Sequence, residues 1–138
     1  MEKENKTQQE TKPVTIHLNK NGEPDGVLVQ TIDESFIVSL HDAENGREMT
    51  WKEAVDNYGD TSLPNKNEAA IICAYLDEIN AALKEAGGDP LDRWYWTGTE
   101  YNANIAWFYY GSYGCLNGSI KYNTYSVRPT LASAFGPF

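Results

Sequence analysis

Histidine and cysteine are the residue types in this sequence best suited to covalent or metal chemistry, and each occurs twice. His17 and His41 lie in the N-terminal half, and no nucleophile-elbow motif accompanies them. Cys73 and Cys115 lack the CxxC or Cys–His spacing of a zinc site. The carboxylates fall on expected helix surfaces and caps, where they have a structural role. We therefore expect no catalytic residue, no metal ligand and no cofactor.

One acidic tripeptide, Glu23-Pro24-Asp25, is similar to the calcium-coordinating tripeptide of sugar-binding lectins. Pro24 and the flanking Gly22 and Gly26 also suit a turn that leads into a strand. The tripeptide lies far along the sequence from the strand-rich C-terminal part, where a lectin would need it. The sequence therefore favours a turn over a calcium site.

A different chemistry, noncovalent recognition, is indicated by the stretch from Tyr95 to Pro129. It contains seven of the nine tyrosines, many Asn, Ser and Gly residues, and only three charged side chains, Glu100, Lys121 and Arg128. Tyrosine supplies a large, rigid contact area, while Ser and Asn supply adaptable hydrogen bonds. A surface with few charges also avoids the cost of removing water from ionised groups on binding.

We expect ten residues of this stretch to converge on one solvent-facing ligand-binding patch. The candidates are Tyr101, Asn102, Asn104, Phe108, Tyr110, Tyr113, Asn117, Tyr122, Asn123 and Tyr125. Successive side chains of a strand point to opposite faces, so Phe108 and Tyr110 point outward if Trp107 points inward.

The framework under this patch is expected to hold the remaining large side chains. Trp94, Trp96, Trp107 and Val127 suit the core of a sheet. Arg128 is a single cation in a nearly uncharged segment, so we expect it to be partly buried and bonded to backbone carbonyls or to Glu100.

The elements that position these side chains follow from changes of pattern along the chain. Residues 26–42 give two apolar runs around a polar turn at residues 33–35, which predicts a hairpin. Thr50 with Glu53 predicts a capped helix from Trp51. Asn65 with Glu68 caps one long amphipathic helix, which ends at residues 87–88 with two glycines.

From Trp94 onward the pattern changes to short strands separated by glycines: WYWTG, NIAWFYYG, GSIKY and YSVRPTLA. A hairpin, two helices and a run of strands predict an α+β domain. We expect a flexible polar tail over residues 1–13 and a single domain over residues 14–138.

The charge distribution restricts the partners. The net charge is −9, and residues 94–138 carry +1, so residues 1–93 carry −10. Such a chain repels phosphate backbones and anionic membranes, so we expect neither nucleic acid nor membrane insertion. No segment approaches the about 18 continuous apolar residues of a transmembrane helix, and the first dozen residues lack the apolar stretch of a secretory signal.

Several short motifs occur in an order that resembles a known family. They are Trp51, Leu63-Pro64, Trp96-Thr97-Gly98-Thr99-Glu100, Ala106-Trp107 and Val127-Arg128-Pro129. Over about residues 26–131 the chain resembles the C-type-lectin-fold domain at the C-terminus of bacterial collagen-like adhesins, which also occurs in phage proteins and in the variable proteins of diversity-generating retroelements. Ser62 stands where that family has arginine, and Asn65 replaces its capping threonine.

The resemblance implies a C-type-lectin-like fold, with two helices packed on short antiparallel strands and much irregular structure. It also implies a ligand surface on the last strands and loops. The implied function is a non-enzymatic adhesin-like or receptor-binding module for a cell-surface protein or glycan, with a surface that a retroelement could diversify. The lack of a signal favours a virion-associated or cytoplasmic protein at synthesis over a Sec-exported one.

Two other functions stay open at this point. Formylglycine-generating oxidases share the lectin-like fold and need two cysteines that hold copper, for which Cys73 and Cys115 are a poor pair. A structural subunit of a fibre or pilus would use the polar tail as a connector. The oligomeric state cannot be read from the sequence.

Overall fold

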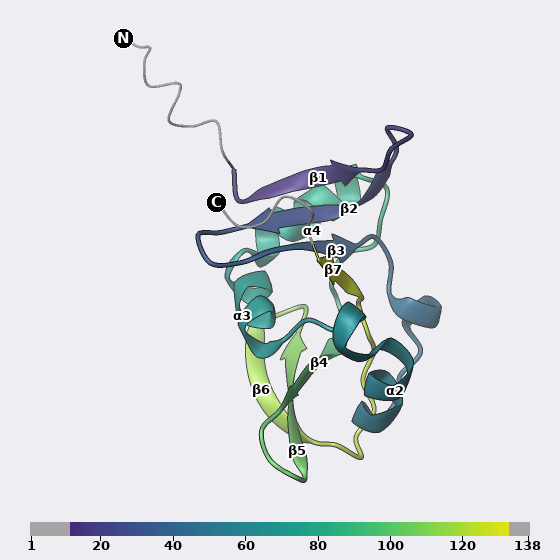
Figure 1. The fold of residues 1–138 in the computed structure, drawn as a ribbon, viewed down its shortest axis with the longest axis vertical. Coiled ribbons are helices and arrows are strands. Elements are labelled where there is room, and N and C mark those ends of the chain that lie inside the picture. Colours follow the sequence, from purple (N-terminus) through teal and green to yellow (C-terminus); the bar gives the residue numbers. More distant parts are fainter. Residues whose placement is uncertain (1–11, 133–138) are drawn as a thin grey trace.

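The computed structural model describes residues 12–132, so the expected tail over residues 1–13 lies almost entirely outside the described residues. Within residues 12–132 two antiparallel sheets lie at opposite ends of the molecule, with helices between and beside them (Figure 1). The expectation of an α+β fold is confirmed. No helix of the described part is both long and apolar enough to cross a membrane.

The first sheet has four strands in the order β1-β2-β3-β7. Its strands are β1 (Val14–Leu18), β2 (Pro24–Gln30), β3 (Ser35–Ser39) and β7 (Thr130–Ala132). The expected hairpin is confirmed as β2 and β3, whereas β1 was not expected. The turn at the acidic tripeptide is also confirmed, since Gly22 has a φ of 81° and Pro24 begins β2. Val14, Val29, Phe36 and Ala132 lie side by side across the four strands, so both ends of the described chain lie at the same end of this sheet, on its two opposite edges.

The second sheet has three strands in the order β4-β5-β6, and seven aromatic residues lie on β4 and β5. Its strands are β4 (Trp94–Glu100), β5 (Ile105–Tyr110) and β6 (Cys115–Ile120). All three overlap strands that the glycine spacing predicts, although β6 begins at Cys115, three residues before the expected strand GSIKY. The fourth expected strand is shorter than its pattern: Tyr125 and Ser126 make isolated bridges, and only Thr130–Ala132 form a strand, in the other sheet.

The helices are a 3-10 helix η1 (Ala43–Gly46), α2 (Trp51–Ser62), α3 (Lys66–Ala74) and α4 (Leu76–Glu85). Both capping boxes are confirmed: the Thr50 side chain accepts from the Glu53 amide, and the Asn65 side chain accepts from the Glu68 amide. The expectation of one long helix after Asn65 is wrong, because the helix breaks at Tyr75, whose φ is −112° and ψ 26°.

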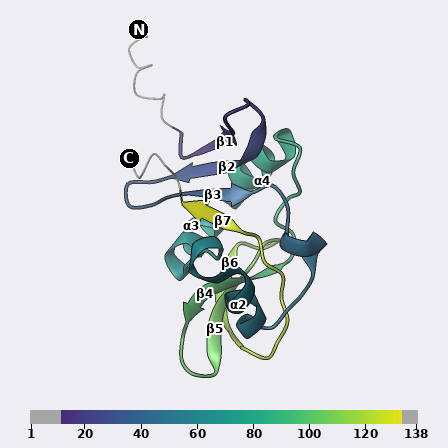
Figure 2. The ribbon, with the colours of Figure 1, turned by 45° about the vertical axis from the view of Figure 1, so that its right-hand side comes forward.

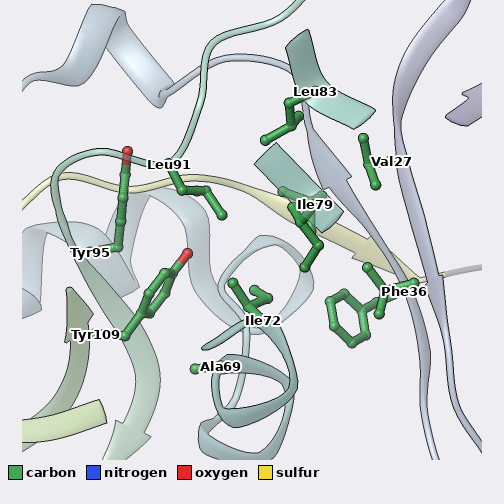
Figure 3. Packing of buried hydrophobic residues seen from close by; sticks show 11 residues of the cluster. Val27, Phe36, Ala69, Ile72, Ile79, Leu83, Leu91, Tyr95 and Tyr109 are labelled. Atoms are coloured by element: carbon green, nitrogen blue, oxygen red, sulfur yellow. The ribbon is translucent and has the colours of Figure 1, made fainter. Parts of the chain in front are cut away.

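Because of the break at Tyr75, α3 and α4 pack against different sheets. Ala69 and Ile72 of α3 face the three-stranded sheet, whereas Ile79 and Leu83 of α4 face the four-stranded sheet. Figure 3 shows these side chains meeting in one core, with the Tyr95 and Tyr109 rings extending toward Leu91. A straight helix would keep its apolar stripe on one side and could not serve both sheets.

A second core lies between α2 and the other face of the β4-β5-β6 sheet. Figure 2 shows α2 beside this sheet, whose other face packs against α3. The buried members of this core are Met49, Ala54, Leu63, Trp96, Ala106, Phe108, Tyr125 and Val127. The buried Trp96 confirms its expected place, and its Nε1–H donates to the Met49 carbonyl at 2.8 Å.

Arg128 is more deeply placed than expected, with 0% of its surface exposed. Its Nη1 donates to the Ser39 and Asp89 carbonyls and its Nη2 to the Pro90 carbonyl, as expected for a residue that fixes the backbone. The alternative partner Glu100 is wrong, since Glu100 pairs with Lys121 and the Arg128 Nε donates to Asp42 instead.

Candidate functional site

The two faces of β5 are occupied differently from the expected arrangement. Ala106 and Phe108 belong to the core under α2, whereas Tyr109 belongs to the core under α3. Trp107 lies on the Tyr109 side but is half-buried, with the Lys66 Nζ 4.1 Å from its ring centroid. The expectations of a buried Trp107 and an outward-facing Phe108 are therefore wrong, and Phe108 is 3% exposed.

Six of the ten candidate residues nevertheless lie on one face of the sheet. Together with Trp94 they form a surface that we name the aromatic face: Trp94, Phe108, Tyr110, Tyr113, Asn117, Asn123 and Tyr125. Residues directly opposite in an antiparallel sheet share a face. Trp94 lies opposite Tyr110, and Asn117 lies opposite Phe108.

Ring contacts connect the aromatic members of this face. The Phe108 and Tyr125 rings are stacked, with centroids 4.5 Å apart. Trp94 meets Tyr110 edge-on at 4.7 Å, and Tyr110 meets Tyr113 at 6.0 Å. The exposed fraction differs widely among these rings, from 3% for Phe108 and 8% for Tyr125 to 76% for Tyr113. The buried rings form the floor of the aromatic face, and the exposed rings can contact a ligand.

The polar members of the aromatic face are only partly free to bind. The Tyr125 hydroxyl is hydrogen-bonded to the Ser119 Oγ at 2.8 Å, and the Asn123 Nδ2 donates to the same Oγ. The Asn117 Oδ1 accepts from the Gly118 amide, while its side chain stays exposed. Asn117 and Asn123 can therefore offer their remaining amide groups to a ligand, whereas the Tyr125 hydroxyl already has a partner.

The remaining four candidates lie elsewhere, so the ten residues do not form one patch. Tyr101 is exposed but packs edge-on against Trp107 at 5.7 Å, on the opposite side of the sheet. The Asn102 Oδ1 accepts from the amides of residues 104 and 105, which gives it a structural role in the β4–β5 loop. Asn104 and Tyr122 line a separate cavity of about 360 Å³ beside the start of α2.

Trp94 is the residue of this surface that sequence reasoning missed, because it was assigned to the core. It is 46% exposed. Its position in the sequence was the available signal. Trp94 and Trp96 are two residues apart, so they lie on the same face of β4. Trp94 is also the first residue of the strand. Trp94 and Tyr125 also line a cavity of about 400 Å³ that extends the aromatic face.

Charged groups gather beside the aromatic face rather than on it. Asp42 forms ion pairs with both Arg128 and Arg93, whose Nε atoms lie 2.7 and 3.1 Å from its two oxygens. The ring of His41 lies 2.9 Å from Asp89 and holds the pKa of that carboxyl below its usual value. Four of these residues, His41, Asp42, Asp89 and Arg93, line a polar cavity of about 270 Å³ next to the Trp94 cavity.

The two cysteines are free thiols on neighbouring elements, with Cys73 in α3 half-buried and Cys115 in β6 exposed. Burial raises the pKa of the Cys73 thiol to about 11, so it is protonated at neutral pH and poorly suited to bind copper as a thiolate. Among residues 12–132 no group of three or more His, Cys, Asp or Glu side chains is placed to hold a metal ion.

Comparison with known proteins leaves the family open. No family model matches the sequence, and no curated protein matches it.

Proposed function

We propose that this chain is a non-enzymatic ligand-binding module with a C-type-lectin-like fold. The aromatic face is its binding surface, and its ligand is a protein or glycan on a cell surface. The observation that carries the proposal is the connected series of aromatic rings on a sheet face that the rest of the described chain leaves open at Trp94, Tyr110 and Tyr113.

The composition of this face supports binding. Its members are Trp, Tyr, Phe and Asn, so no charged group on the face itself has to lose water when a partner covers it. Exposed, contiguous aromatic surface on a monomeric protein usually marks a partner site. The buried Phe108 and Tyr125 hold the outer rings in place, which reduces the entropy lost on binding.

The positions of the family-like motifs support the C-type-lectin-like fold. Trp96, Ala106 and Val127 meet in one buried cluster, and Arg128 ties the last segment to the backbone around residues 39 and 89–90. The motifs that carry the resemblance therefore belong to the framework, while the residues between them form the surface. This division suits a family in which the surface varies on a fixed frame.

The retroelement part of the proposal concerns three exposed members of the face and the half-buried Tyr110. Tyr110, Tyr113, Asn117 and Asn123 would be the positions at which diversification changes the ligand. Sequencing the gene's surroundings tests this directly. A reverse-transcriptase gene with a near-copy of the 3′ coding region would support it, and their absence from the complete genome would contradict it.

The binding proposal is tested with a fluorescently labelled chain on a glycan array and on panels of intact cells. The double variant Tyr110→Ala/Tyr113→Ala should weaken any binding by more than about 2 kcal/mol, as hot-spot truncation does. Tyr101→Ala is the matched control, because Tyr101 is an exposed tyrosine on the opposite side of the sheet. Equal binding by the double variant and the wild type would contradict the proposal, as would no binding to any surface tested.

A further inference from the structure

The cavity at the edge of the aromatic face combines an exposed indole ring with carboxylates. It measures about 400 Å³ and is lined by Glu48, Asp92, Arg93, Trp94, Thr124 and Tyr125. The Trp94 and Tyr125 rings stand 5.5 Å apart at an angle of 56°, so they form two walls of the cavity. Glu48 and Asp92 are both exposed beside these walls.

The positive charge in this cavity already has a partner. The Nε of Arg93 lies 3.1 Å from the Asp42 Oδ2, and its guanidinium packs against Gly46, where a methyl group would come within 2.8 Å of the Arg93 Cζ. Arg93 is therefore held toward the neighbouring polar cavity. Its aliphatic stem can line the Trp94 cavity while its charge is turned to Asp42.

The carboxylates in the cavity, by contrast, have no cationic partner within residues 12–132. The Glu48 Oε1 accepts a weak hydrogen bond from the Thr124 hydroxyl at 3.4 Å, and Asp92 makes no ion pair in the part of the chain that the structure describes. The two adjoining cavities contain four carboxylates, those of Asp42, Asp89, Asp92 and Glu48. The arginines beside them are Arg93 and the buried Arg128, so the local formal charge is −2 with histidine neutral.

The two half-buried indole rings of this protein are each covered by a lysine. The Lys66 Nζ lies 4.1 Å from the Trp107 ring centroid, and the Lys121 Nζ lies 4.6 Å from that of Trp51. Trp96 is buried. Trp94 is thus the exposed tryptophan over which residues 12–132 place no lysine or arginine. A cation over an indole face is attracted by the ring quadrupole, and nearby carboxylates add to this attraction.

We propose that the Trp94 cavity binds a lysine or arginine side chain of a protein ligand, with the cation over the Trp94 ring and beside Glu48 and Asp92. This inference rests on the proposed function, because it names the chemistry of the ligand at one edge of the aromatic face. If this inference is correct, the ligand is a protein with a basic side chain and not a neutral glycan. The strong negative charge of the chain also attracts such a partner from a distance.

The test uses a small probe, Nα-acetyl-lysine methylamide, and the indole N–H signals of the ¹⁵N-labelled protein. Nα-acetyl-norleucine methylamide is the matched probe, because it keeps the aliphatic chain and lacks the ammonium group. Trp94→Leu assigns the Trp94 signal. Glu48→Gln removes one cavity carboxylate, and Glu85→Gln is the matched control, since Glu85 is an exposed carboxylate on α4.

The lysine probe should shift the Trp94 signal in a saturable way that weakens with added salt, while the norleucine probe should not. Glu48→Gln should weaken the probe about five-fold, and Glu85→Gln should leave it unchanged. Equal shifts by both probes, equal weakening by both carboxylate variants, or a shift caused by methyl glucoside instead of lysine would overturn the inference.

These results can be separated from the test of the proposed function. The titration needs no natural ligand, so an unresponsive Trp94 overturns the cation site alone. Conversely, a lysine-binding Trp94 cavity would stand even if the Tyr110→Ala/Tyr113→Ala variant bound every surface as the wild type does.

Discussion

Arg128 and Asp42 form a buried ion pair that joins the last segment of the chain to the turn after β3. The Arg128 Nε lies 2.7 Å from the Asp42 Oδ1, and Arg128 has no exposed surface. Three backbone carbonyls, of Ser39, Asp89 and Pro90, accept the remaining guanidinium hydrogen bonds. A buried guanidinium is tolerated when it is paired and hydrogen-bonded, and Arg128 has an ion pair with Asp42 and four hydrogen bonds.

Replacing Arg128 by Met should therefore destabilise the fold strongly. Met keeps much of the aliphatic volume but removes the Arg128 donor from three backbone carbonyls and leaves Asp42 with one cation fewer. We expect a loss of about 3–5 kcal/mol in the free energy of unfolding, measured by urea denaturation. Arg128→Lys should recover little, because an ammonium group cannot reproduce the planar fork of donors.

Arg47→Met is the control for this prediction. Arg47 also makes two ion pairs, with Glu44 and Glu53, but it is 45% exposed. An exposed pair contributes between 0 and about 1 kcal/mol. A loss for Arg128→Met no larger than that for Arg47→Met would show that the buried network does not hold the last segment in place.

The tryptophans of adjacent strands should differ in their contribution to stability. Trp96 is fully buried and bonded to the Met49 carbonyl, so Trp96→Ala should cost about 3–5 kcal/mol. Trp107 is half-buried and covered by Lys66, so Trp107→Ala should cost about 1–2 kcal/mol. Urea denaturation of both variants measures the difference, and equal losses would contradict the positions of the two rings.

Locally encoded features could be predicted from the sequence. The capping boxes at Thr50 and Asn65 depend on residues three positions apart, so their patterns are complete within a few residues. The β2–β3 hairpin and the three strands of the second sheet were marked by polar turns and glycines. Tyr110 and Tyr113 do lie in ring contact, as expected, although that expectation assumed that Trp107 points inward.

Features decided by long-range packing could not be predicted in this way. Strand β5 reads IAWFYY, with no polar residue to mark an outer face, so alternation separates Trp107 from Phe108 without showing which is covered. Both faces are in fact covered, by α3 on one side and α2 on the other. The helix break at Tyr75 likewise depends on the positions of two sheets, which the helix sequence does not contain.

Alkylation of Cys73 should be slow at pH 8, because burial raises the pKa of its thiol. With its pKa raised to about 11, about one molecule in a thousand carries the thiolate at pH 8. Iodoacetamide at pH 8 should therefore label the exposed Cys115 and leave Cys73 unmodified, as mass spectrometry of tryptic peptides would show. Raising the pH to 10 should speed Cys73 labelling about 100-fold. Cys115→Ser isolates the Cys73 reaction, and full labelling of Cys73 at pH 8 would contradict its burial.

The same pKa shift makes a prediction about alkaline stability. The folded-state pKa is raised above the ordinary value of 9.0, so the unfolded thiol ionises first. The stability contributed by this group is present below pH 9 and is lost as the pH rises toward about 11. Cys73→Ala should remove this part of the pH dependence, as seen in urea midpoints measured from pH 8 to about 10.5. An unchanged slope would show that Cys73 titrates alike in the folded and unfolded chains.

Replacing Phe108, in the floor of the aromatic face, should affect stability far more than replacing Tyr113, on its exposed surface. Phe108 stacks on Tyr125 and is 3% exposed, whereas Tyr113 is 76% exposed and touches Tyr110 only edge-on. Phe108→Ala should therefore cost about 3–5 kcal/mol in the free energy of unfolding, because it leaves a cavity between Trp94, Trp96 and Tyr125. Tyr113→Ala should change stability by less than about 0.5 kcal/mol, since little packing is lost. Urea denaturation measures both values under the same conditions. A large loss for Tyr113→Ala would place its ring in the folded framework, and a small loss for Phe108→Ala would mean that the floor of the face can collapse around the missing ring.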